Sequence, residues 1–235
     1  MMIYPDPDFT RLPENVVGLF EGASAANFFS HIGWYELMSR SARAADTQVR
    51  LYVDAEPPSA GLLLRTDGKR RLHGFSNAYT MEYGPIGRSN AASCMVLHHL
   101  AEAIAKEDPR RRTIRIAALD PLAASYAALR DGLRAAYWVV KPFFDCGNWY
   151  EDTAGLDFRS YLDARPAVLR NTFRRKTKTA AKEGAEYVFS HAGCDISRLI
   201  EDYETVYRNS WKTAEPFAQF MHDLIRLSFR LGALR

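Results

Sequence analysis

The sequence predicts an α/β fold in which helices pack on a mixed sheet. Apolar residues recur at helical spacing in several segments, and shorter runs rich in β-branched, aromatic and aliphatic residues lie between them, bounded by Gly and Pro. The predicted order is helix, three or four strands of antiparallel type, helix, strand, helix, strand. This order is typical of helices packed against a sheet. A chain of 235 residues is long enough to bury one large core or two small ones.

The first expected elements follow a Pro-rich lead-in over residues 1–21. Ser24 is an N-cap candidate for a helix over 25–43, where apolar side chains recur at helical spacing. Strands are expected next, and the Asp67-Gly68 pair predicts a hairpin turn among them. These strands span 49–53, 61–64, 71–75 and 79–83.

Helices and strands then alternate. Asn90 is expected to cap a helix over 91–106, and another helix is expected to begin at Asp120-Pro121, because Pro favours the first helical position. The remaining strands are expected at 113–119 and at the aromatic-rich segment 136–144.

An acidic connector over 151–157 precedes a change of composition. Every charged residue from Arg165 to Lys182 is basic, and Pro166 is placed to begin a helix there. Such a run is most often a solvated helix face, and the alternative is a contact with an acidic partner, a nucleic acid or anionic headgroups. The helix lacks the interleaved exposed aromatics of a single-strand binder.

Two further helices are expected after this basic one. A short strand over 185–190 is followed by a helix that Asp195 can cap. Pro216 opens the last helix, whose apolar side falls within 217–229 and whose end is marked by Gly232. The sequence thus predicts two domains, over 1–150 and 157–235.

Composition excludes several classes of protein. The net charge of +3 is small and does not by itself indicate nucleic acid. Cys94, Cys146 and Cys194 are an odd number of widely spaced cysteines, so neither a disulfide framework nor a structural metal is expected. The N-terminal residues do not resemble a signal peptide, and no membrane span is expected. We therefore expect a cytoplasmic protein.

Several segments carry a resemblance to a known family. They are Tyr161-Leu162 with 170–176, Lys182-Glu183-Gly184, Tyr207-Arg208-Asn209-Ser210-Trp211-Lys212, Leu231-Gly232, and the N-terminal Phe28-Phe29-Ser30 with Trp34. On these residues the chain resembles the GNAT acyltransferases. Within them it resembles the two-halved branch of cellulose-biosynthesis-associated, CelD-like acetyltransferases, with the Fem-type transferases as more distant relatives.

The resemblance implies a GNAT-like mixed sheet flanked by helices over 1–150, then the helical opening of a second GNAT-like domain over 157–235. It implies N-acyl transfer, above all N-acetyl transfer, from acetyl-CoA or another acyl-CoA to an amine. The acceptor would be a small molecule or an amine related to polysaccharide or peptidoglycan. Because the second sheet and its acyl-CoA site would follow position 235, we expect a truncated chain of weak or no activity. Its apolar helix face over 217–229 is expected to be exposed.

An acyl-CoA site in this family holds the pyrophosphate at a Gly-rich turn that leads into a helix, where free N–H groups and the helix dipole favour an anion. The candidate turn here contains Gly84, Gly87 and Arg88. The family's Arg/Gln-x-x-Gly-x-Gly/Ala pattern is absent, and Pro85 removes one donor. The alternative is a strand-to-helix turn without a ligand.

Trp211, Lys212 and Glu215 lie between the last two predicted helices, where the resemblance implies a border of the acceptor site. A Trp ring can stack on a substrate, and Lys or Glu can orient it. The alternative is that Trp211 packs into the core as an anchor at the helix end. The sequence identifies no catalytic base, and its His and Cys spacings predict no metal site.

Two other functions stay open. One is a Fem-like aminoacyl or peptidyl transfer from aminoacyl-tRNA, which the basic helix allows without requiring it. The other is a non-catalytic binding or assembly module. DNA is not an expected partner, and RNA is expected only for the tRNA-dependent alternative.

Overall fold

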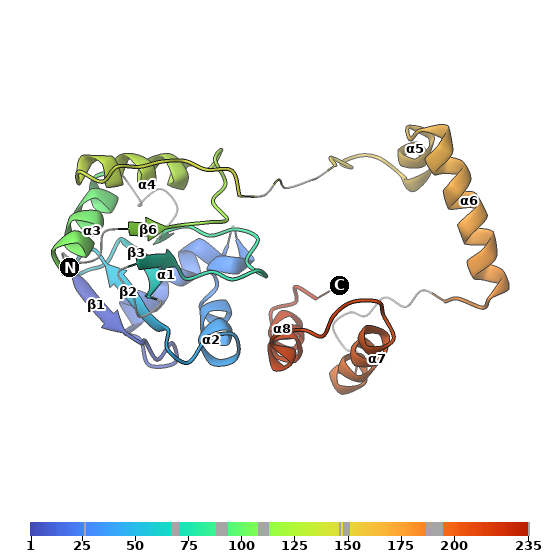
Figure 1. Cartoon of the computed structure of the whole chain (residues 1–235), viewed down its shortest axis with the longest axis horizontal. Helices are drawn as coiled ribbons and strands as arrows, with labels where there is room; N and C mark the ends of the chain where they lie inside the picture. Colours follow the sequence, from blue (N-terminus) through green and yellow to red (C-terminus); the bar gives the residue numbers. More distant parts are fainter. Residues whose placement is uncertain are drawn as a thin grey trace.

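The computed structural model describes residues 1–25, 27–66, 71–87, 94–107, 113–145, 147, 151–186 and 195–234. Within these residues the chain is an α/β structure with a mixed sheet flanked by helices, as the sequence predicts (Figure 1). The described residues of 1–145 contain the sheet and are called the sheet unit below. The described residues from 151 onward form helices joined by loops.

The described part of the sheet has six strands in the order β1-β2-β3-β4-β6, with β5 paired to β3. The pairs are antiparallel, except that β4 and β6 run parallel. The strands are β1 (Met2–Pro5), β2 (Gln48–Val53), β3 (Ala60–Thr66), β4 (Arg71–Gly74), β5 (Ile86–Gly87) and β6 (Thr113–Arg115). The strands predicted at 49–53, 61–64 and 71–75 are confirmed, whereas 113–119 shortens to β6 and 79–83 forms no strand.

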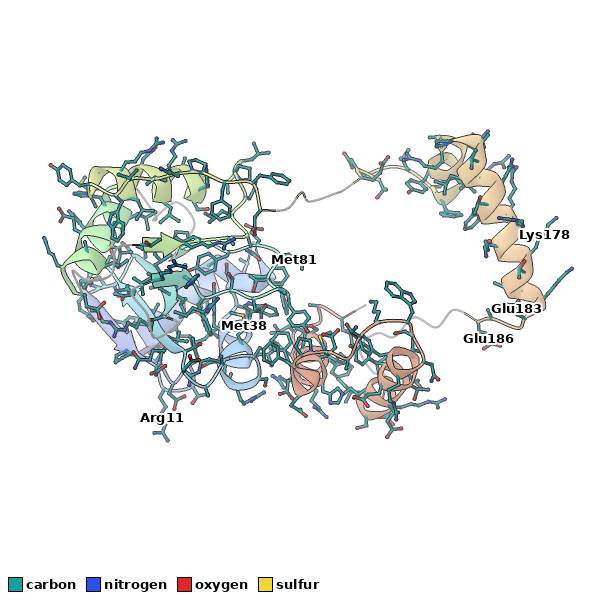
Figure 2. All side chains as sticks on the ribbon, viewed as in Figure 1. Arg11, Met38, Met81, Lys178, Glu183 and Glu186 are labelled. Atoms are coloured by element: carbon teal, nitrogen blue, oxygen red, sulfur yellow. The ribbon has the colours of Figure 1, made fainter. Side chains whose placement is uncertain are left out.

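The central strands are buried on both faces. Leu51 pairs with Leu63 and both belong to one core, together with Met38 (Figure 2), whereas the adjacent pair of Tyr52 and Leu62 belongs to the opposite core. Successive side chains of a strand point to opposite faces, so an apolar run requires cover on both sides. The cover is formed by α1 (Glu14–Ser24) and α2 (Ile32–Ser41) on the first face, and by α3 (Cys94–Glu107) and α4 (Ala124–Ala135) on the second.

The N-terminal prediction is wrong in two respects. The expected lead-in over 1–21 contains β1 and most of α1, and the single helix expected over 25–43 is broken. Asn27 accepts a hydrogen bond from the backbone N–H of Phe29, and His31 accepts one from Gly33, so each caps a new helical segment. Between them lies only a short 3₁₀ turn, Phe28–Ser30.

The strand predicted over 136–144 is also wrong, because residues 136–145 form no helix or strand. Tyr137 has a positive φ of 63°, which is incompatible with an extended strand, and its side chain is 93% exposed. Aromatic and β-branched residues favour strands only where a half-buried sheet surface is available. The preceding helix begins at Ala124 rather than at Pro121.

Some predicted features lie outside the described residues. They are the Asp67-Gly68 turn, the Asn90 cap with the helix start at 91–93, and residues 187–190 of the strand expected at 185–190. The pairing of Thr66 with Leu72 shows that β3 and β4, the strands before and after these two residues, are antiparallel.

Four helices follow residue 151 in the described part of the chain. They are α5 (Phe158–Asp163), α6 (Ala167–Lys182), α7 (Ile196–Arg208) and α8 (Ala218–Arg230). Pro166 precedes α6, and the Asp195 carboxylate caps α7 by accepting from the N–H groups of Ser197 and Arg198, so both predicted starts are confirmed. Among the described residues, no helix combines the length and apolar character needed to cross a bilayer.

The apolar face of α8 packs against the sheet unit, so the prediction that it is exposed is wrong. Phe220 is fully buried, with its ring 5.6 Å from that of Trp34 on α2. Asp223 adds polar contacts, because its carboxylate accepts from Arg40 at 3.2 Å and from the Ser41 hydroxyl at 3.1 Å. The helix therefore completes the core of the sheet unit on the α2 side (Figure 1).

Candidate functional site

The α7–α8 loop reaches the sheet unit through one carboxylate. Glu215 of this loop accepts a hydrogen bond from the hydroxyl of Tyr79, which lies between β4 and β5 and is 136 positions away in sequence. Tyr203 and Tyr207 stand beside this pair, one helical turn apart on α7 with ring centroids separated by 5.8 Å. We call Tyr79, Tyr203, Tyr207 and Glu215 the phenol–carboxylate cluster.

Local structure holds Tyr79 in place from two sides. Asn77 forms an Asx turn in which its side-chain oxygen accepts from the N–H of Tyr79 at 3.0 Å. The Tyr79 ring stacks on Phe220 with centroids 4.9 Å apart and planes 23° apart. The packing of α8 on the sheet unit therefore also sets the position of the phenol.

The pKa values of the three phenols in the cluster are raised. Burial, followed by the hydrogen bond and charge of Glu215, raises the pKa of Tyr79 well above the usual value for a phenol. The same two causes raise the pKa of Tyr207, whose hydroxyl donates to the backbone oxygen of Thr213 at 2.8 Å. The pKa of Tyr203 is also raised, by burial and then by Glu215 and Glu204. The cluster thus presents one carboxylate among neutral phenols.

A second contact braces the two helices that flank the loop. The Nε2 atom of His222 on α8 lies 2.6 Å from a carboxylate oxygen of Glu204 on α7. Both side chains are only partly exposed. Because Glu204 lies between Tyr203 and Tyr207 on α7, this contact fixes the orientation of the helix that carries the two phenols.

The residues predicted at the acceptor site are partly brought together. Glu215 lies in the cluster, and the Nζ atom of Lys212 is 6.0 Å from the Tyr207 ring centroid, within cation–π range. Trp211 is 93% exposed, so the alternative that it anchors the core is wrong. An exposed indole in this loop is available for contact with a ligand.

Sequence reasoning missed the role of the tyrosines. Tyr203 and Tyr207 are four positions apart on a helix, a spacing that places them on one face and offered a detectable signal. Tyr79 gave no such signal, because its partner is 136 positions away and only the docking of α8 brings the two together.

The two glycines of the turn predicted to bind the pyrophosphate have different surroundings. Gly87 is in β5 and pairs with Ala60, and a Cβ there would lie 2.8 Å from the backbone oxygen of Ser59, so strand pairing alone explains this glycine. A Cβ on Gly84 would meet only Ser125 Oγ, at 3.8 Å, which leaves space beside Gly84. Arg88 lies outside the described residues. Of the two glycines described in this turn, Gly84 is therefore the one with the free space that a close phosphate approach requires.

The chemistry of the cluster suits an organic cation. A carboxylate can accept several charge-assisted hydrogen bonds, and aromatic faces attract ammonium groups. Among the described residues, no group of three or more His, Cys, Asp or Glu side chains is placed to hold a metal ion. A protonated amine is the ligand that matches one carboxylate among neutral phenols.

Comparisons with family models, curated proteins and solved structures found no match to this chain. The assignment of the site therefore rests on its geometry and on the residue types that the structure brings together.

Proposed function

We propose that the chain acts in N-acyl transfer from an acyl-CoA to an amine, as a GNAT-like protein, and that the phenol–carboxylate cluster binds the acceptor amine. One observation carries this proposal. The Glu215 carboxylate is held against Tyr79 in the loop for which the family resemblance implies an acceptor site. The mixed sheet with helices on both faces is compatible with that family.

Recognition of the amine follows from its charge. A primary ammonium donates up to three hydrogen bonds, and a hydrogen bond to a charged group contributes about 1.5–3 kcal/mol. An exposed cation–π contact adds about 0.5–1 kcal/mol. The Lys212 ammonium, 6.0 Å from the Tyr207 ring centroid, is an internal example of a primary amine at this surface.

The reaction requires the amine to be oriented and deprotonated. Its nitrogen, after losing one proton to solvent, attacks the thioester carbonyl; the C–N bond forms, the C–S bond breaks, and the CoA thiol leaves with a proton. In this scheme Glu215 holds the ammonium before deprotonation, and Tyr79 fixes the carboxylate. Their contribution is one of positioning, which lowers the entropic cost of bringing two substrates together.

The test is transfer of labelled acetyl from acetyl-CoA to a panel of primary amines, including amino sugars and diamines. Glu215→Gln removes the charge while keeping the shape of the side chain, and we expect it to raise the KM for the amine at least tenfold. Glu201→Gln is a matched control, because Glu201 is an exposed carboxylate on α7 outside the cluster.

A calorimetric titration with acetyl-CoA tests binding of the donor separately from binding of the acceptor amine. Saturable micromolar binding would support donor use by this chain, and Gly84 would then be the candidate contact. If the chain transfers acetyl from acetyl-CoA to none of the amines and acetyl-CoA does not bind, the proposed function is wrong for this chain.

A further inference from the structure

The fold of the α7–α8 loop holds the backbone of Lys212 beside the phenol–carboxylate cluster. The Ser210 hydroxyl donates to the backbone oxygen of Tyr207 at 2.8 Å and accepts from the N–H of Lys212 at 3.3 Å. The Tyr207 hydroxyl donates to the backbone oxygen of Thr213 at 2.8 Å. The loop is therefore bonded to the last turn of α7 both before and after Lys212.

The side chain of Lys212 presents its amine to the same helix. Its Nζ atom lies 6.0 Å from the Tyr207 ring centroid, at the outer limit of a cation–π contact. The side chain is exposed, and in the described part of the chain no carboxylate lies within ion-pair distance of it, unlike Lys106, which lies 3.6 Å from Glu102. The Lys212 amine is thus accessible to a second substrate.

The carboxylate of the cluster is within reach of this amine. Burial, followed by a hydrogen bond with Glu215, raises the pKa of Tyr207, so the ring beside Lys212 also contacts Glu215. Lys212 and Glu215 are three positions apart, and three residues span at most about 11 Å. A Lys side chain is a flexible four-carbon stem, so rotation of this stem can bring the ammonium to the Glu215 carboxylate.

The candidate donor contact belongs to the segment that also carries Tyr79. Gly84 follows Tyr79 by five positions between β4 and β5, and five residues span at most about 18 Å. Because Tyr79 donates to Glu215, an acyl-CoA held beside Gly84 would be close to the cluster.

Tethering gives Lys212 an advantage over a free amine. An amine fixed in the loop of the acceptor site has a high effective concentration there, and it loses little further freedom when it reacts. Among the described residues, Lys212 is the one lysine within cation–π range of an aromatic ring. The structure thus distinguishes this lysine from the exposed lysines of α6.

We propose that Lys212 is a self-acylation site, at which the chain transfers the acyl group of an acyl-CoA to its own side-chain amine. This inference rests on the proposed function, because it uses the same donor and the same acceptor cluster. After losing one proton to solvent, the Lys212 nitrogen attacks the thioester carbonyl; the C–N bond forms, the C–S bond breaks, and the CoA thiol leaves with a second proton from the nitrogen. The amide product is neutral, so acylation ends the cation–π contact and leaves the cluster open to an external amine.

The experiment is incubation of the whole chain with acetyl-CoA labelled in its acetyl group, followed by mass spectrometry of its peptides. We expect label at Lys212 to accumulate at least tenfold faster than at Lys178, an exposed lysine of α6 that reports spontaneous acetylation (Figure 2). The rate per chain should not depend on chain concentration, because the transfer occurs within one chain. Equal rates at the two lysines, or a rate that rises in proportion to chain concentration, would overturn the proposal.

Variants test whether the cluster directs this reaction. Glu215→Gln should slow labelling of Lys212 at least tenfold and leave Lys178 unchanged, whereas the control Glu201→Gln should change neither. Lys212→Gln removes the tethered competitor, so a diamine should bind this variant about threefold more tightly in calorimetry without any donor. Circular dichroism of each variant reports its helix content. Unchanged labelling of Lys212 in a folded Glu215→Gln variant would contradict the inference.

The outcomes separate this inference from the proposed function. If free amines accept acetyl while Lys212 is labelled no faster than Lys178, the inference is wrong and the proposed function stands. If Lys212 alone is labelled, the inference is supported and the amines of the panel are not acceptors. If neither Lys212 nor any amine is labelled above the spontaneous rate, the inference is wrong, and the proposed function is wrong as well when acetyl-CoA does not bind.

Discussion

The hydroxyl of Tyr79 donates a hydrogen bond to the carboxylate of Glu215 across 136 positions of sequence. The ring of Tyr79 also stacks on Phe220, so one side chain of the sheet unit contacts both the α7–α8 loop and the first turn of α8. Burial, followed by the hydrogen bond and charge of Glu215, raises the pKa of this phenol above its ordinary value. The candidate acceptor site and the docking of α8 therefore depend on the same residue.

Removing this hydroxyl should have a measurable but limited effect. We expect Tyr79→Phe to lower the free energy of unfolding by about 1.5–3 kcal/mol, the contribution of a hydrogen bond to a charged group, while keeping the stack on Phe220. Urea denaturation checks this. The control is Tyr4→Phe, because the hydrogen-bond partner of the Tyr4 hydroxyl among the described residues is the Met2 sulfur, at 3.7 Å. An equal loss in the two variants would contradict the importance of the Glu215 contact.

Truncating the buried ring of α8 should be far more damaging. Phe220 is fully buried against Trp34 and Tyr79, so Phe220→Ala removes apolar contacts and leaves a cavity in the core. We expect a loss of about 3–5 kcal/mol in the free energy of unfolding. Phe144→Ala is the matched control, because Phe144 is 86% exposed and its truncation should change stability by less than about 0.5 kcal/mol. A neutral Phe220→Ala would show that α8 is not part of this core.

The cap at His31 predicts a dependence of stability on pH. Burial lowers the pKa of His31, and its neutral Nδ1 accepts from the N–H of Gly33 at the start of α2. A lowered pKa means that the unfolded chain binds the proton first. The stabilisation is therefore complete above the unfolded pKa of about 6.5 and is lost as pH falls from there through the lower pKa of the folded state.

Two substitutions at His31 test this dependence. His31→Asn keeps a side-chain acceptor that does not titrate, so its stability relative to the native chain should rise as pH falls from 7.5 to 5. His31→Ala loses the cap and should cost about 1 kcal/mol at pH 7.5. Urea midpoints measured across this pH range check both expectations, and parallel profiles for the native chain and His31→Asn would contradict them.

The two glycines of the predicted phosphate turn should respond differently to a methyl group. Gly87→Ala places a Cβ 2.8 Å from the Ser59 backbone oxygen and should cost about 1–3 kcal/mol in stability. Gly84→Ala meets only Ser125 Oγ, at 3.8 Å, and should leave stability nearly unchanged. If Gly84 borders bound acyl-CoA, the same variant weakens acetyl-CoA binding in calorimetry. Unchanged binding would remove Gly84 as a contact.

Local patterns in the sequence predicted the elements that depend on nearby residues. The residues at β2 and β3 predicted strands, and Asp195 predicted the start of α7. These signals are local because alternation, capping and turn chemistry involve residues only a few positions apart. The strand predicted at 136–144 from local residue types was wrong, because residues 136–145 form no strand. High strand propensity leads to a strand only where a sheet surface is available.

The contacts that form the candidate site were decided only by tertiary structure. The sequence by itself determined that 217–229 is an apolar helix face and that Glu215 lies in a loop before it. In the folded chain this face buries Phe220 against Trp34, and this packing places Glu215 within hydrogen-bonding distance of Tyr79. Likewise, the sequence determined the charge of α6, but the turn between α5 and α6 placed Phe158 beside Phe173. The physical reason is that burial of apolar surface is not directional, so composition shows that a face must be covered without showing which surface covers it.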